Sequence, residues 1–100
     1  MNLVEISKAL ANDTRMNIMC WLRDPEKHFR PHKDGKGFED GVCVNVITEK
    51  TEMSQSTVSH YLSSLQRAGL VQTVRIGKWT YYRRNDDVIR KYLSELQLIL

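Results

Sequence analysis

The stretch SQSTVSHYLSSLQRAGLV, residues 54–71, decides the fold of this chain. Val58, Leu62 and Leu65 follow one another at offsets of four and three, the spacing that places side chains on one face of a helix. Ser54 is a good residue to cap the start of that helix, and Gly69 suits the left-handed position just past its end. The opposite face is polar and nearly uncharged, with Gln55, Ser56, Ser59, His60 and Ser63.

The residues on either side predict a helix before this stretch and a hairpin after it. Val42, Val46 and Ile47 repeat at helical spacing, so a helix is expected over residues 42–50. A turn of three residues, 51–53, then leads into the helix capped by Ser54. Past Gly69, residues 70–76 alternate and are rich in β-branched side chains, Gly77 and Lys78 form a turn, and residues 79–83 return as a second strand.

Two more helices are expected near the N-terminus and one at the C-terminus. Leu3, Ile6 and Leu10 mark the first, and the second follows a cap at Asn12 or Asp13. The last helix, residues 86–100, has apolar side chains on more than one stripe: Val88, Ile89, Tyr92, Leu93, Leu96 and Ile99. A terminal helix this apolar is expected to pack against a partner beyond its own domain.

Residues 25–41 differ in composition from the rest and are expected to form a loop insertion. They contain two prolines, three glycines and two histidines, with Phe29 and Phe38 as the only large apolar side chains that could tether them. His28 and His32, with nearby carboxylates, raise the hypothesis of a metal site. Pro31 argues against a helix that would place both histidines on one face, so a solvated loop is favoured.

Length and composition limit the class of protein. With 100 residues, 41% of them hydrophobic, the chain is expected to form a single domain over residues 1–100. The longest apolar run, Ile18–Leu22, is far too short to span a membrane, and no apolar signal region is visible, so a cytoplasmic location is expected. Two cysteines make no disulfide framework. No phosphate-binding glycine loop, catalytic triad or complete metal-ligand set is present, so no enzyme is predicted.

Charge is unevenly distributed along the chain, whose formal net charge is +3. Residues 54–84 contain five basic side chains and no carboxylate, whereas the segments before and after are each slightly acidic. Acidic side chains would repel phosphates, so a segment free of them favours a polyanion as partner.

A helix, a short turn, a second helix and a basic hairpin together make a winged helix-turn-helix, a mainly α fold with a β-hairpin wing. In such folds the second helix enters the major groove of DNA and its N-terminal residues meet the base edges. Glutamine can pair bidentately with adenine, and hydroxyl groups can reach bases or phosphates. The candidate DNA-binding residues are Ser54, Gln55, Ser56, Thr57, Ser59, His60, Arg75, Lys78 and Arg83. The predicted function is sequence-specific binding of double-stranded DNA to regulate transcription.

The main alternative is a winged-helix protein-interaction module that does not bind DNA. The segment without carboxylates favours DNA, because a protein-docking module need not lack acidic side chains. Trp79, Tyr81 and Tyr82 could stack on bases, although alternating strand aromatics usually divide between core and surface. Arg83 and Arg84 could clamp a phosphate or simply end a solvated strand, and the sequence leaves both open.

The stretch from Met53 to Val71 resembles the ArsR/SmtB-type winged-helix transcriptional repressors, with its serine-led helix and the AGLV entry to the wing. Residues 9–15, ALANDTR, resemble the junction between the first two helices of that family. The resemblance implies a homodimeric repressor, built from the first and last helices, that binds a palindromic operator. The residues expected at the dimer interface are Leu3, Ile6, Leu10, Ile89, Tyr92, Leu93 and Leu96.

The sensor region departs from the family pattern. Where arsenic-type members have Cys-Val-Cys, this chain has Cys43, Val44 and Asn45, and an amide is a poor ligand for soft metals. The last helix contains no histidine, so the zinc site of other members is also incomplete. Cys43 could be an inert buried thiol, a metal ligand or a redox or ligand sensor together with Cys20. A degraded or non-metal sensor is expected, with no cofactor, and a repressor without an effector remains open.

Overall fold

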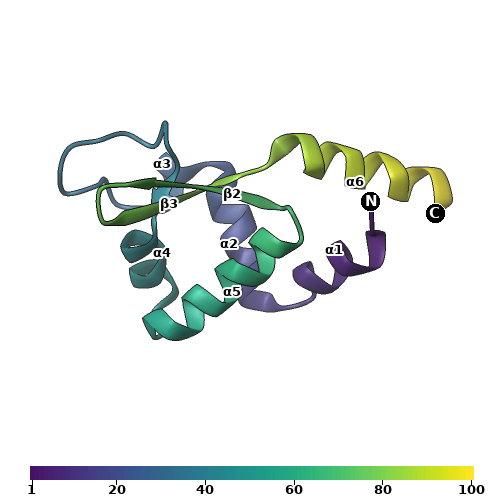
Figure 1. The fold of residues 1–100 in the computed structure, drawn as a ribbon, viewed down its shortest axis with the longest axis horizontal. Coiled ribbons are helices and arrows are strands. Elements are labelled where there is room, and N and C mark those ends of the chain that lie inside the picture. The colour runs from purple at the N-terminus through teal and green to yellow at the C-terminus, as the bar shows by residue number, and fades with distance from the viewer.

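The computed structural model describes all residues 1–100, which form six helices and three strands (Figure 1). In chain order the elements are α1 (Leu3–Leu10), α2 (Asp13–Arg23), α3 (Pro25–His28), β1 (Val42–Cys43), α4 (Val44–Thr51), α5 (Gln55–Arg67), β2 (Val71–Ile76), β3 (Trp79–Arg84) and α6 (Asp86–Ile99). The strands form one antiparallel sheet in the order β1-β3-β2. The molecule measures 45 × 25 × 24 Å, and α6 extends away from the body toward one end of its long axis (Figure 1). No helix combines the length and apolarity that a membrane crossing requires.

Helix α5 has the bounds and the buried face that its spacing predicts. The Ser54 side chain caps the helix by accepting the backbone N–H of Thr57. Gly69 follows the helix with φ +81°, a left-handed conformation that glycine adopts without a steric penalty. Val58, Leu62 and Leu65 are fully buried in the hydrophobic core. The helix is therefore held by one face only, and its other face is left for solvent or a ligand.

The helix expected over residues 42–50 begins later than predicted. Val42 and Cys43 instead form β1, whose residues pair with Tyr82 and Tyr81 of β3, and α4 begins at Val44. Hydrogen bonding to a strand about 40 positions away in the chain outweighs the local helical spacing here. The hairpin thus becomes a three-stranded sheet, and the start of α4 is attached to the base of the wing.

Gly41 makes the pairing of β1 with β3 possible. Its φ is +105°, and a Cβ at this position would lie 2.4 Å from the carbonyl oxygen of Tyr82. No side chain fits in that space without separating the two strands. Only glycine allows the chain to enter β1 so close to β3.

The insertion at residues 25–41 is more structured than the predicted solvated loop. Residues 25–28 form the short helix α3, which begins with Pro25 at a position that suits its fixed φ. Phe29 is buried, and Phe38 packs against the core, so both aromatics tether the segment as expected. His32 is also buried: its Nε2 accepts the backbone N–H of Cys43 at 3.1 Å, and its ring packs edge-on against Phe38 and Tyr81. A satisfied hydrogen bond offsets the cost of burying this polar ring.

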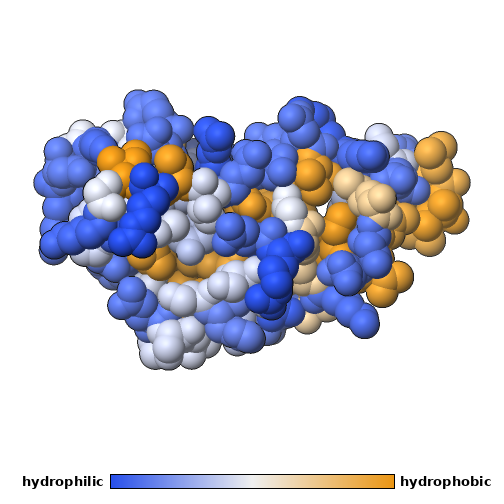
Figure 2. All heavy atoms as spheres, in the orientation of Figure 1, coloured by the Kyte–Doolittle hydropathy of each residue, from blue (hydrophilic) through white to orange (hydrophobic).

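The predicted interface residues of α1 and α6 lie in three environments. Ile6 and Tyr92 are buried within the chain itself, where the Tyr92 hydroxyl lies 2.7 Å from the Ser7 hydroxyl. Leu3, Leu10, Ile89 and Leu96 are half-buried and pack against the core. Leu93 is 57% exposed and Leu98 84% exposed, and Figure 2 shows apolar atoms gathered at the end of the molecule where α6 ends. The α1–α6 surface thus keeps apolar side chains that this chain alone does not cover.

Candidate nucleic-acid interface

The polar face of α5 is the first part of the candidate site. Gln55, Ser56 and His60 are exposed, and Thr57 and Ser59 are half-buried at its edges. The side chains of Gln55 and Ser59 make no hydrogen bond within the chain, so their donors and acceptors are free. Free amide and hydroxyl groups on an exposed helical face are suited to pairing with base edges.

Ser54 and Thr57 have a structural task at the start of α5. The Ser54 hydroxyl accepts the backbone N–H of Thr57 at 3.2 Å and lies 2.9 Å from its hydroxyl oxygen, to which it donates. These bonds fix the N-terminus of the helix, where backbone N–H groups and the helix dipole favour an anion. Ser54 and Thr57, both among the residues predicted to touch DNA, thus also hold this end of α5 in place.

Arg15 fixes α5 relative to the N-terminal helices. Its Nε donates to the carbonyl oxygen of Ala9 at 2.6 Å, and its guanidinium carbon lies 5.5 Å from the centre of the Tyr61 ring on α5. The contact satisfies a carbonyl at the end of α1 and stacks a cation on an aromatic face. The sequence pattern gives no sign of this positioning role, because the three residues come from three elements.

The wing presents basic side chains at its tip. Gly77 and Lys78 connect β2 and β3, with Ile76 opposite Trp79, as the hairpin pattern predicts. Arg75 is exposed and its Nε donates to the Gly77 carbonyl, while the Lys78 ammonium lies 5.3 Å from the centre of the Trp79 ring. In Figure 1 the wing tip and the N-terminus of α5 lie at the same end of the molecule, opposite the end of α6.

Arg83 and Arg84 do not join the basic wing tip. Arg83 pairs across the hairpin with Gln72, at the base of the wing, roughly 16 Å from Lys78 at the usual rise per strand residue. Arg84 is only 20% exposed and is held by Asp86 and by the carbonyl of Met19. The sequence leaves open whether Arg84 holds a phosphate or ends a solvated strand. In the structure it does neither, because its two contacts connect β3 to α6 and α2.

The basic side chains at the wing tip take no part in the ion pairs of the chain. The three ion pairs of the chain, Arg30–Glu49, Arg84–Asp86 and Arg90–Asp87, all lie outside α5 and the wing tip. Arg75 and Lys78 therefore have no carboxylate partner and keep their charge available for phosphates. At the base of the wing, burial raises the pKa of the Tyr82 hydroxyl above its usual value, so this residue stays neutral.

The candidate sensor residues are separated by the fold. Cys43 is buried at the end of β1 beside His32, whereas Cys20 is exposed on α2 and lines a different pocket. Asn45, which replaces the second thiol of the family pattern, is exposed on the first turn of α4. No group of three or more His, Cys, Asp or Glu side chains lies close enough together to hold a metal ion.

Comparison with known sequences identifies the kind of protein that this chain resembles. Residues 40–73, which run from Asp40 before β1 to the start of β2, match the sequence model of the bacterial regulatory proteins of the arsR family. The chain is 48% identical over 97 residues to the HTH-type transcriptional regulator YbzH of Bacillus subtilis, with 97% of each chain covered. It is also 34% identical over 88 residues to the arsenical resistance operon repressor of the same organism, covering 88% of this chain and 70% of the repressor.

A solved structure shares the fold. The homodimeric winged helix-turn-helix DNA-binding domain of Mb0332 from Mycobacterium bovis, a possible ArsR-family regulator, superposes with a TM-score of 0.64 at 30% identity. The superposition covers 96% of this chain and 75% of that one. The match extends over α1 and α6 as well as the helix-turn-helix, so the whole chain follows one known architecture.

Proposed function

This chain belongs to the arsR family of winged-helix transcriptional regulators, and from that premise we propose that it acts as a homodimer that binds a palindromic operator and represses transcription. The wing and α5 are the DNA-binding elements in this proposal. α5 enters the major groove with Gln55, Ser56, Ser59 and His60 toward the bases, while Arg75 and Lys78 contact the phosphate backbone.

One observation carries this function: the free polar face of α5 and the unpaired cations of the wing tip lie on a stretch without a single carboxylate. Residues 54–84 include both elements, and none of their five basic side chains is balanced by an acidic residue of the same stretch. A surface that reads base edges needs neutral donors and acceptors, and a surface that holds phosphates needs cations. The neutral groups lie on the first turns of α5, and four of the five cations lie on the strands and turn of the wing, which supports this division of roles.

The homodimer is supported by the apolar surface of α1 and α6. Ile89, Leu93 and Leu96 recur at helical spacing along α6, Leu100 follows its end, and Val4 on α1 is 62% exposed. Contiguous apolar side chains of this kind are rare on monomeric proteins and indicate an interaction surface. A two-fold symmetric dimer on this surface would present two copies of α5 to two half-sites of a palindrome.

DNA binding should weaken steeply with salt. If Arg75 and Lys78 each contact one phosphate, a dimer makes about four such contacts, and raising the salt from 50 to 200 mM should lower the affinity about a hundredfold. Fluorescence anisotropy with the DNA upstream of its own gene measures this directly. The double variant Arg75→Ala/Lys78→Ala should lose most of the dependence. An affinity that does not change with salt would exclude phosphate contacts as a source of binding and favour a protein-docking module.

Base recognition by α5 is tested with single truncations. Gln55→Ala and Ser56→Ala should each weaken binding to the operator more than binding to random DNA. The expected difference is about 1–3 kcal/mol for each base contact that is lost. Asn17→Ala removes a similar amide from an exposed position on α2. This control should leave the affinity for the operator and the affinity for random DNA unchanged. An equal loss on operator and random DNA would assign Gln55 and Ser56 to positioning on the backbone rather than to base recognition.

A further inference from the structure

A large cavity that is open to solvent lies away from the candidate DNA-binding surface, between α2, α3 and α6. It has a volume of about 650 Å³ and is lined by 13 residues, eight of them hydrophobic. This volume lies in the range of sites for small organic molecules. Neither the helix-turn-helix nor the wing tip needs this cavity.

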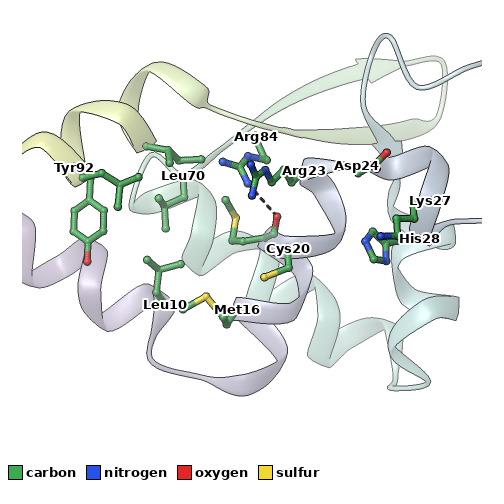
Figure 3. A pocket seen from close by; sticks show the side chains of 13 residues that line it. Leu10, Met16, Cys20, Arg23, Asp24, Lys27, His28, Leu70, Arg84 and Tyr92 are labelled. Carbon is green, nitrogen blue, oxygen red and sulfur yellow. Dashed lines mark hydrogen bonds between the residues drawn. The ribbon is translucent and has the colours of Figure 1, made fainter.

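The cavity has an apolar end and a cationic end. In Figure 3, Tyr92, Leu10 and Leu70 surround one end, while Arg23 and Arg84 lie at the middle and Lys27 and His28 at the other end. Met16 and Cys20 form the wall between them. A molecule that fills the cavity would therefore meet hydrocarbon on one side and cations on the other.

The charges at the cationic end are not balanced. Arg23, Lys27 and Arg84 line the cavity against a single carboxylate, that of Asp24. Arg84 is paired with Asp86, whereas Arg23 and Lys27 form no ion pair and are exposed to solvent. Guanidinium and ammonium groups without partners bind a carboxylate through charge-assisted hydrogen bonds, which are about twice as strong as neutral ones.

We propose that this cavity is an effector site for an amphiphilic carboxylate, a molecule with an apolar chain or ring and one anionic head group. The apolar part packs over Leu70 and Tyr92, and the carboxylate lies between Arg23 and Lys27. The cationic end selects the anion, because a carboxylate gains charge-assisted hydrogen bonds there that an uncharged molecule cannot make. The apolar end favours a ligand with a hydrocarbon part. A small inorganic anion has no apolar surface to bury there and so gains no hydrophobic stabilisation.

The cavity is placed where its occupant can affect DNA binding, a consequence that rests on the proposed function. Ile89 and Leu93 line the cavity and belong to the α6 surface proposed for the dimer. Arg84, at the junction of β3 and α6, joins the base of the wing to the carbonyl of Met19 on α2. A ligand wedged between α2 and α6 changes the angle of α6 to the body, and hence the spacing of the two α5 helices in a dimer.

The first experiment measures binding without DNA. Isothermal titration calorimetry of the intact protein with dodecanoate, below its micelle concentration, should show saturable binding of one molecule per chain. Dodecan-1-ol, which has the same chain without the charge, should bind at least about tenfold more weakly. NMR amide shifts on adding dodecanoate should be largest in α2, α3 and the first half of α6. Equal binding of acid and alcohol, or shifts centred on the end of α6, would overturn the proposal.

Paired variants separate the cavity from general charge. Arg23→Ala/Lys27→Ala should weaken dodecanoate binding about tenfold or more. Arg90→Ala/Lys91→Ala removes two cations from exposed positions of α6 outside the cavity and should leave binding unchanged. Cys20→Phe places a large ring in the cavity from an exposed position and should abolish binding without unfolding the chain. Equal binding by the two double variants would contradict the assigned head-group site.

The second experiment adds DNA. Saturating dodecanoate should lower the affinity for the upstream DNA about tenfold, a typical size for coupling between two sites. An unchanged DNA affinity, with dodecanoate bound, would overturn the effector role. If the chain binds no DNA under any condition, the proposed function fails, and calorimetry still decides whether the cavity binds the carboxylate.

Discussion

Gly41→Ala is expected to destabilise the protein by about 3 kcal/mol or more, a large part of the 5–15 kcal/mol that holds a typical domain folded. The new Cβ would lie 2.4 Å from the carbonyl oxygen and 2.7 Å from the carbonyl carbon of Tyr82. Backbone atoms cannot rotate away as a flexible side chain can, so β1 must separate from β3. The left-handed φ of +105° adds about 1–3 kcal/mol of backbone strain. Urea unfolding followed by circular dichroism, and a melting temperature lowered by more than about 12 °C, would show the effect.

Gly35→Ala is the matched control for this prediction. Gly35 also has a positive φ, +79°, but a Cβ there would meet nothing within 4 Å. Its substitution should cost only the conformational strain, about 1–2 kcal/mol. If the two variants lower the free energy of unfolding by the same amount, the close approach of β1 and β3 does not contribute to the cost, and the account of Gly41 is wrong.

Leu93→Glu is expected to convert the proposed dimer into a monomer and to lower operator affinity about 10²- to 10⁴-fold. Leu93 is 57% exposed, so a carboxylate can be accommodated in the single chain, but at an apolar interface it would be buried without a partner. Linked half-site binding gains its affinity from effective concentration, and a monomer loses that gain. Sedimentation velocity measures the mass, and anisotropy measures the affinity.

Ser94→Glu introduces the same charge one residue further along α6, on its exposed polar side. This variant should remain a dimer and bind the operator like the parent. A Leu93→Glu protein that still sediments as a dimer would move the interface off this stripe of α6. If both variants become monomers, net charge rather than the position of Leu93 decides association.

Much of the fold follows from local pattern. The spacing of Val58, Leu62 and Leu65, with a capping serine before and a glycine after, is enough to place α5 and its buried face. The hairpin follows in the same way from alternation and the Gly77 turn. Membership of the family was predicted from these same residues and is confirmed. Signals of this kind lie within the element and the few residues that flank it, so the local sequence is enough to detect them.

The features that sequence did not predict depend on residues far apart in the chain. β1 is two residues long, and only its pairing with Tyr81 and Tyr82 makes it a strand. His32 lies in a polar, proline-containing segment, and its burial depends on the backbone of Cys43, which local pattern does not bring near. The large cavity draws its walls from several elements, so no single window of sequence contains it. The residues that read DNA remain a prediction, because their placement on α5 shows access and not contact.

The division of α5 into two faces has a consequence for engineering. Every side chain that the core requires of this helix is on one face, and Gln55 and Ser59 on the other make no bond within the chain. If α5 contacts DNA as proposed, libraries at the exposed positions Gln55, Ser56 and His60 can vary its sequence preference with little loss of folded protein, since surface substitutions usually change stability by less than about 0.5 kcal/mol. Ser54 should stay constant in such libraries, because the helix begins on its hydroxyl.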